Sequence, residues 1–234
     1  MRAFLKIVQT EVRLISREPT NLLFIVLLPA TMAWIVGGNT APAARTSTIM
    51  AMLGLSPMLF GLMTFPMLLV GYRERGMLRR LKITPLSPAL YLVAQAFVGL
   101  LLVLLGGALV IGVGVGVFNT ALPQHPALLA AGFALGALTF IAIGALIGSV
   151  TRTSRSAQVL SVVVFGGMMV ALLLGGSADS LAGSLSRWLP THHFSQLVHS
   201  FWAGSGAIIW SSVLLLVGVG LASFAGAARL FRWE

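Results

Sequence analysis

Residues 89–118, ALYLVAQAFVGLLLVLLGGALVIGVGVGVF, and residues 127–150, ALLAAGFALGALTFIAIGALIGSV, contain no Asp, Glu, Lys or Arg. A helix needs about 20 apolar residues to cross the hydrocarbon core of a membrane. Each stretch is therefore long enough for one crossing. Segment 119–126 between them, NTALPQHP, carries two prolines that interrupt the helical pattern. This part of the chain predicts two membrane-spanning helices.

The rest of the chain has a similar composition. Of its 234 residues, 58% are hydrophobic and 9% are charged, whereas a soluble domain carries about 25% charged residues. This excludes a water-soluble globule and a disordered chain, and the absence of cysteine excludes disulfides and thiolate chemistry. The stretches are too long for barrel strands and do not alternate. We therefore predict an all-α, polytopic integral membrane protein, residues 1–234 forming one domain. Its six predicted transmembrane helices are about 21–38, 48–70, 89–118, 127–150, 157–176 and 207–228.

The net charge of +10 reflects membrane topology. Every basic residue except Arg45 and Arg187 falls at one end of the predicted spans. By the positive-inside rule, both termini face the cytoplasm, so binding to nucleic acid is not needed to explain the charge. The excess of Arg over Lys is typical of a GC-rich bacterial genome, which predicts a multi-pass protein of the bacterial cytoplasmic (inner) membrane. Four tryptophans fall at predicted outer boundaries as interfacial anchors: Trp34, Trp188, Trp202 and Trp210.

Two segments outside the spans are predicted to lie at the membrane surface. Residues 1–19 form an amphipathic pattern that ends at Pro19, which is typical of an interfacial helix among lipid headgroups. Residues 180–206 are polar and aromatic, and Pro190 interrupts them. We expect short outer helices there, near an extracellular exit.

Residues 73–84 form a basic loop that also carries an apolar stripe. As a helix, this segment would place Met77, Leu78 and Leu81 together, with arginines on the far side. A solvated loop that only fixes topology would explain the arginines but not the stripe. A short surface helix with such a stripe is suited to a groove on a partner protein.

Residues 74–88, ERGMLRRLKITPLSP, followed by Tyr91, resemble the first cytoplasmic loop of type-2 ABC-transporter permeases, a group that includes drug-resistance efflux permeases. The segments 189–194, LPTHHF, and 230–234, LFRWE, are also similar to family patterns. In this family the loop is a coupling helix that docks on a nucleotide-binding subunit. The resemblance implies this role for Glu74, Arg75, Gly76, Met77, Leu78, Leu81 and Lys82. The family's loop often begins with two acidic residues, whereas here only Glu74 is present.

The resemblance also implies the assembly and the energy source. The expected complex contains two copies of an ABC ATP-binding subunit and a second permease chain, as a homodimer or a heterodimer, surrounded by membrane lipid. The two lysines, Lys6 and Lys82, do not follow a glycine, so this sequence has no P-loop. ATP and magnesium are therefore expected on the partner, and this chain is predicted to be a transport subunit without a cofactor, a metal site or catalytic residues of its own.

The cargo is predicted to be hydrophobic or amphipathic, a drug or a lipid-like compound, because the spans offer only uncharged polar groups to a substrate path. The candidates for that path are Thr64, Gln95, Thr139, Gln158 and Ser161. Two glycine pairs with G-x-x-x-G spacing, Gly132 with Gly136 and Gly144 with Gly148, indicate close helix packing either within the chain or between subunits.

Two other classes of function stay open. An ion-driven transporter or channel would normally use titratable groups inside its spans, and the six predicted spans contain no Asp, Glu, Lys, Arg or His. An intramembrane hydrolase could use Ser205, but no span supplies a histidine base. His192, His193 and His199 are expected to be interfacial polar residues, because adjacent histidines project to different faces of a helix and no carboxylate lies nearby.

Overall fold

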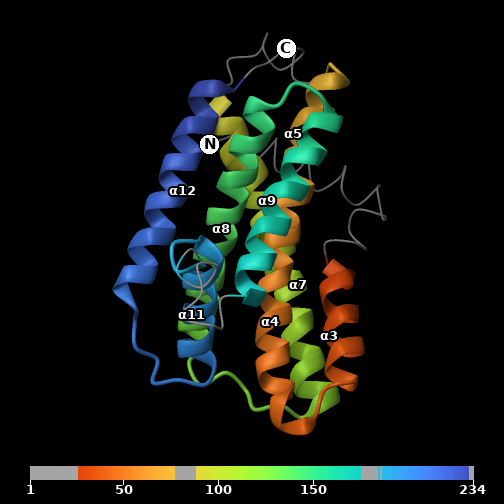
Figure 1. The fold of residues 1–234 in the computed structure, drawn as a ribbon, viewed down its shortest axis with the longest axis vertical. Helices are drawn as coiled ribbons and strands as arrows, with labels where there is room; N and C mark the ends of the chain where they lie inside the picture. Colours follow the sequence, from red (N-terminus) through yellow and green to blue (C-terminus); the bar gives the residue numbers. More distant parts are fainter. Residues whose placement is uncertain (1–25, 77–87, 175–183, 185, 232–234) are drawn as a thin grey trace.

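The computed structural model describes residues 26–76, 88–174, 184 and 186–231, and within these ranges it contains helices and no strands (Figure 1). Prolines begin α7, α8 and α11, as expected for a residue whose missing N–H has no partner at a helix start. The α-helices are α3 (Leu28–Gly38), α4 (Arg45–Met58), α5 (Phe65–Glu74), α7 (Pro88–Phe118), α8 (Pro126–Val150), α9 (Ser154–Leu174), α11 (Pro190–Trp202) and α12 (Trp210–Leu230).

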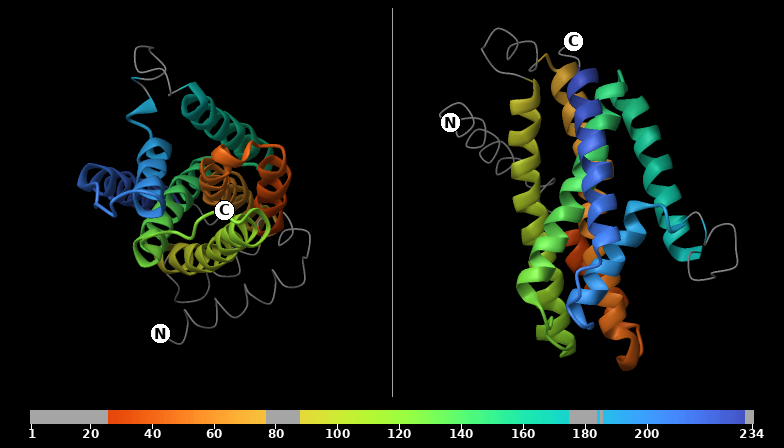
Figure 2. Two further views of the ribbon diagram at one scale, coloured as in Figure 1. Left: turned by 90° about the horizontal axis from the view of Figure 1, so that it is seen from below. Right: turned by 90° about the vertical axis from the view of Figure 1, so that its left-hand side faces the viewer.

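Helix α8 is the centre of the bundle. It packs against α12, α5, α11, α7 and α9, and buried residues occur on all its sides. Both views in Figure 2 place α9 and α12 on the outside of the bundle. The end of α5, the α8–α9 turn and the end of α12 lie at one end of the bundle, whereas the α3–α4 turn and the loop before α8 lie at the other (Figure 1). The predicted cytoplasmic and outer connections thus separate to opposite ends.

Four described helices are long and apolar enough to cross a membrane: Pro42–Glu74, Leu90–Phe118, Pro126–Val150 and Trp210–Leu230. They correspond to the second, third, fourth and sixth predicted spans. The described apolar parts at the first and fifth spans are shorter, Leu28–Gly38 and Ser154–Val170. The count of six spans therefore stays a prediction. The predicted interfacial helix, 1–19, and the docking stripe at 77–81 lie outside the described residues.

The second span is one continuous rod that contains a π-helical segment. A 3-10 turn (Pro42–Ala44) leads into α4, the π-helix η3 (Leu59–Thr64) follows, and α5 continues to Glu74. Proline cannot donate the helical hydrogen bond to the residue four positions earlier, and Pro57 and Pro66 flank η3 on either side. The wider π turn absorbs this interruption without ending the rod.

Glycines allow η3 and α8 to meet backbone to backbone. A Cβ atom added at Gly144 would lie 1.8 Å from the Gly61 carbonyl oxygen, and one added at Gly61 would lie 2.5 Å from the Phe140 carbonyl carbon. Cβ atoms added at Gly132 and Gly136 would meet the Phe201 and Phe194 rings at 2.9 and 2.0 Å. These predicted glycine positions therefore pack within the chain, which decides between the two alternatives in favour of intramolecular contact.

At the end of the bundle that holds the α3–α4 turn, α11 contacts the loop between α7 and α8. The backbone N–H groups of Gln124 and His125 donate to the carbonyls of Trp202 and Phe201, both at 3.1 Å. Trp202 Nε1 donates to the Ala121 carbonyl at 3.2 Å, and its side chain is only 1% exposed. The prediction that Trp202 is an interfacial anchor is therefore wrong, because its ring is buried and its N–H is satisfied inside the protein. Trp34, Trp188 and Trp210 are all more than half exposed, as anchors should be.

Candidate functional site

The last turn of α5 lies directly before the predicted docking segment. Gly76 ends the helix in a left-handed conformation with φ +69°, and its N–H donates to the Arg73 carbonyl at 2.9 Å. Glycine accepts this conformation without the penalty that a Cβ atom brings. The rod therefore ends at Gly76. Just before that end, Arg73 and Glu74 contact the residues around the α8–α9 turn.

Arg73 caps the end of α8. Its Nη2 donates to the Gly148 carbonyl at 3.3 Å and also to the Thr151 carbonyl. The last carbonyls of a helix have no partner within the helix, and they form the negative end of its dipole. The Arg73 guanidinium donates hydrogen bonds to these carbonyls, and its positive charge stabilises the negative end of the helix dipole.

Glu74 caps the start of α9. That helix begins at Ser154, three residues after Thr151. One carboxylate oxygen accepts from the Ser154 backbone N–H at 2.7 Å, and the other accepts from the Ser154 hydroxyl. Thr153 and Ser156 complete the helix start, because the Ser156 N–H donates to Thr153 Oγ1 and the Thr153 N–H donates to Ser156 Oγ, both at 3.2 Å. This reciprocal pair is a capping box. The Thr153 hydroxyl thus accepts from the N–H of Ser156, and the Glu74 carboxylate accepts from the N–H of Ser154.

We call Arg73 and Glu74, together with their partners Gly148, Thr151 and Ser154, the α5–α9 clamp. Of the docking residues predicted from sequence, the structure describes Glu74, Arg75 and Gly76, and both carboxylate oxygens of Glu74 bind within the chain. Met77, Leu78, Leu81 and Lys82 lie outside the described residues. Sequence reasoning missed the roles of Arg73 and Ser154. The capping pattern TSRS at 153–156 was the available signal for Ser154.

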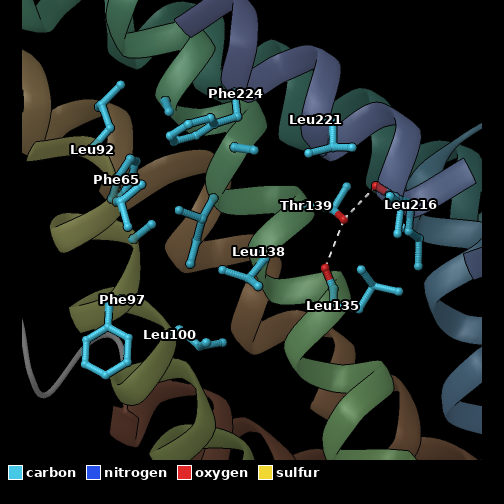
Figure 3. Close-up of a pocket in the computed structure, with 17 residues that line it drawn as sticks. Phe65, Leu92, Phe97, Leu100, Leu135, Leu138, Thr139, Leu216, Leu221 and Phe224 are labelled. Atoms are coloured by element: carbon cyan, nitrogen blue, oxygen red, sulfur yellow. Dashed lines mark hydrogen bonds between the residues drawn. The ribbon is translucent and has the colours of Figure 1, made fainter. Parts of the chain in front are cut away.

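An apolar cavity of about 450 Å³ lies between α7, α8 and α12 (Figure 3). Phe97, Leu138 and Leu221 line it and remain 41, 42 and 66% exposed, so the cavity opens at the side of the bundle. Thr139 is the one predicted path residue in its lining, and its hydroxyl contacts the carbonyls of Leu135 at 2.9 Å and Leu216 at 3.1 Å. Because backbone carbonyls already hold this hydroxyl, the lining offers a guest only apolar contacts.

The other predicted path residues do not converge on this cavity. Gln95 is buried and donates to Tyr91 Oη at 3.1 Å along α7. Gln158 is exposed on α9, and Thr64 is half-buried in η3. Ser161 is buried, and its hydroxyl has no hydrogen-bond partner among the described residues. The structure therefore does not bring the five candidates together into one path.

A polar network joins α11 to α12. His193 Nδ1 lies 3.0 Å from Ser212 Oγ, and its Nε2 lies 2.8 Å from the Arg187 carbonyl. Gln196 bridges Ser212 and His192 through contacts of 3.0 and 3.1 Å. Burial, followed by the nearby charges of His193 and Arg187, lowers the pKa of His192 below its usual value. The imidazoles of His192 and His193 pack edge to face at 5.5 Å, but they contact different partners, Gln196 for His192 and Ser212 with the Arg187 carbonyl for His193.

The described residues offer little for hydrolysis or for metal binding. Ser205 is exposed in the loop after α11, where its hydroxyl contacts the Ala207 N–H at 3.4 Å. Within the described ranges, no three His, Asp or Glu side chains gather as a metal site would require. The geometry of this part of the chain is that of a helical scaffold with apolar cavities, among them the one between α7, α8 and α12, and with a clamped end.

Comparisons with known proteins agree with this scaffold. A family model described as "ABC-2 family transporter protein" matches residues 18–229. "Putative transport permease YvfS" of Bacillus subtilis (strain 168) is 27% identical over 177 residues, which cover 72% of this chain and 70% of that protein. "Inner membrane transport permease YhhJ" of Escherichia coli (strain K12) is 26% identical over 172 residues, which cover 70% of this chain but 46% of that protein. The protein of the same name in Shigella flexneri matches equally.

Proposed function

This chain belongs to the ABC-2 family of transporter proteins, and we propose that it is the permease subunit of an ATP-driven exporter in a bacterial inner membrane. The observation that carries the proposal is the family match over residues 18–229, which covers nearly the whole chain. The apolar helical bundle is consistent with it, because four described helices are long enough to span a membrane. Both termini and the α8–α9 turn would then face the cytoplasm.

Energy would come from a separate ATPase subunit, present in two copies. This sequence contains no P-loop lysine motif with which to bind the phosphates of ATP. The apolar stripe of Met77, Leu78 and Leu81 would insert into a groove on the ATPase, with Arg75, Gly76 and Lys82 beside it. Glu74, the acidic residue at the start of this segment, binds Ser154 within the permease. Its carboxylate would therefore contact α9 of this chain instead of the ATPase. A second permease chain, identical or homologous, would complete the assembly.

The cavity supports a hydrophobic or amphipathic cargo. Its volume of about 450 Å³ falls within the range of about 300–1,000 Å³ that is usual for small-molecule sites. Its lateral opening beside Leu138 would admit a molecule from the bilayer, and its lining would not compensate the desolvation of a charged group. Drugs and lipid-like compounds fit these conditions, and their export is the activity we propose.

The direct test is capture of the ATP-binding protein encoded next to this chain. The detergent-solubilised chain is compared with Met77→Asp/Leu81→Asp, which places two charges in the docking stripe. Leu122→Asp is the matched control, since Leu122 is 68% exposed at the opposite end of the bundle. We expect the parent and the control to capture the ATPase and the double variant to lose it, because buried carboxylates would be unpaired in the groove.

The captured complex is then reconstituted into liposomes with a fluorescent phospholipid as the test cargo. ATP-dependent movement of this lipid that requires the intact docking stripe would support export of amphipathic compounds. Failure of the parent chain to capture the ATPase, together with transport by the chain alone, would overturn the ABC assignment in favour of an ion-driven transporter or channel.

A further inference from the structure

The α5–α9 clamp joins three helix ends at one point. Arg73 binds the carbonyls at the end of α8, and Glu74 binds the first N–H and the hydroxyl of α9. The residues in contact are 75 to 80 positions apart in the chain. Both contacts involve a charged group, and such hydrogen bonds are roughly twice as strong as neutral ones. The end of α5 is therefore fixed to the turn between α8 and α9.

The clamp lies next to the segment proposed to bind the ATPase. Gly76, with its positive φ, ends α5 only two residues after Glu74, and the proposed docking stripe begins at the next residue. Along the chain, the stripe is joined to the bundle through the clamp on one side and through the start of α7 on the other. On the clamp side, the contact between Glu74 and Ser154 connects the end of α5 to the start of α9.

Helix α9 is placed to respond to such a displacement. It lies on the outside of the bundle, and it contacts α5 and η3 more extensively than it contacts α8 (Figure 2). Val159 and Val163 on its outward side are 60 and 63% exposed. Helix α12, in contrast, packs along α8. A shift of α9 would therefore leave the packing of α12 on α8 in place.

We infer that Arg73 and Glu74 are positioning residues that transmit the ATPase-driven movement of the docking segment to α9. This inference rests on the proposed function. Glu74 is exposed and its partner Ser154 is half-buried, whereas Arg73 binds carbonyls of the buried residues Gly148 and Thr151. Exposed charge contacts contribute little to folding stability, so the Glu74–Ser154 contact can be removed with little effect on the fold, and the tests below target it.

The test measures the position of α9 directly. The chain has no cysteine, so spin labels are placed at Val159→Cys on α9 and Ala225→Cys on α12, both at exposed positions. The labelled chain is mixed with unlabelled chain and assembled with its ATPase. The distance between the labels is then measured without nucleotide and with a non-hydrolysable ATP analogue and magnesium. We expect the distance to change on nucleotide binding in the parent complex.

Two variants open the clamp from opposite sides. Glu74→Ala removes the carboxylate, and Ser154→Pro removes both donors while keeping a residue that is favoured at the first position of a helix. We expect both variants to lose the nucleotide-dependent distance change, and Ser154→Pro, which lies outside the proposed docking segment, to capture the ATPase as the parent does. The double variant should be no worse than either single variant. Arg155→Gln removes an exposed charge beside Ser154 and should retain the full change.

Capture and distance separate the two ways of failing. If clamp variants bind the ATPase and keep the full distance change, or if the parent complex shows no change, the inference is overturned while the proposed function stands. If the parent does not capture the ATPase, both fall. Thermal unfolding of each variant checks the fold. Should the stronger variants fail to fold, Glu74→Gln and Ser154→Ala, which each keep part of the contact, take their place with a partial loss expected.

Discussion

At the scale of single residues, one proton position in the α11–α12 network follows from its hydrogen bonds. The Arg187 carbonyl can only accept, so His193 Nε2 carries a proton. The Ser212 hydroxyl donates to Gln196 Oε1 and also lies 3.0 Å from His193 Nδ1. These contacts join α11 to α12 next to His192.

The lowered pKa of His192 predicts how the stability of the folded protein depends on pH. Because burial lowers its pKa in the folded protein, the unfolded state binds more protons once the pH falls below the ordinary histidine value of about 6.5. Stability should be constant above that value and should decrease as the pH falls below it. Thermal unfolding in detergent should show this decrease in the parent and a shallower one in His192→Gln. His199→Gln, at an exposed position of α11, should follow the parent; equal slopes for all three proteins would contradict the prediction.

Residue roles were the least predictable part of the molecule. The sequence indicated that Glu74 was special, but its partner Ser154 is 80 residues away and is reached only in the folded chain. Thr139 was a reasonable path candidate, yet two backbone carbonyls hold its hydroxyl. Polar groups buried inside an apolar bundle find hydrogen-bond partners within the protein, both near and far along the chain. A sequence shows which polar residues exist but not which carbonyl each one meets.

At the scale of elements, the contact of η3 with α8 depends on two glycines. Alanine at Gly144 would place its Cβ 1.8 Å from the Gly61 carbonyl oxygen, which belongs to the backbone and cannot move aside as a side chain can. Overpacking of this kind costs about 1–3 kcal/mol, or more. We therefore expect Gly144→Ala to lower the midpoint of thermal unfolding.

The matched control for this prediction is Gly218→Ala in α12. No atom lies within 4 Å of a Cβ added there, and alanine favours the helix by about 1 kcal/mol over glycine. This variant should unfold at the same temperature as the parent or at a higher one. An equal midpoint for the two alanine variants would show that α8 and η3 are less tightly packed than the structure indicates.

The helices themselves were largely predictable, because the length of a charge-free stretch depends only on the sequence. The described helices overlap every predicted span. The π segment was not predicted, since its two prolines mark an interruption without specifying how the backbone accommodates it. The glycine spacing of α8 likewise indicated close packing but could not identify η3 and α11 as the partners.

At the scale of the whole molecule, the connections alternate between the two ends of the bundle. The end of α5 and the α8–α9 turn lie at one end, and the loop before α8 lies at the other (Figure 1). By sequence, the clamp and Arg155 belong to the first end and Leu122 to that loop. Of the described basic residues, Arg73, Arg75, Arg152, Arg155 and Arg229 belong to elements at the first end, which the positive-inside rule would place in the cytoplasm. The structure shows which connections share an end of the bundle. Which of the two ends faces the cytoplasm is a prediction from the sequence.

Single cysteines test this orientation, since the chain has none of its own. Leu122→Cys and Ser195→Cys, both at exposed positions, should react with a membrane-impermeant maleimide on intact cells, because the loop before α8 and α11 would face outward. Arg155→Cys, exposed at the other end, should react only after the membrane is permeabilised. Labelling of Arg155→Cys on intact cells with protection of the other two would invert the chain. The clamp would then face away from any cytoplasmic ATPase, and the exporter proposal would lose its docking surface.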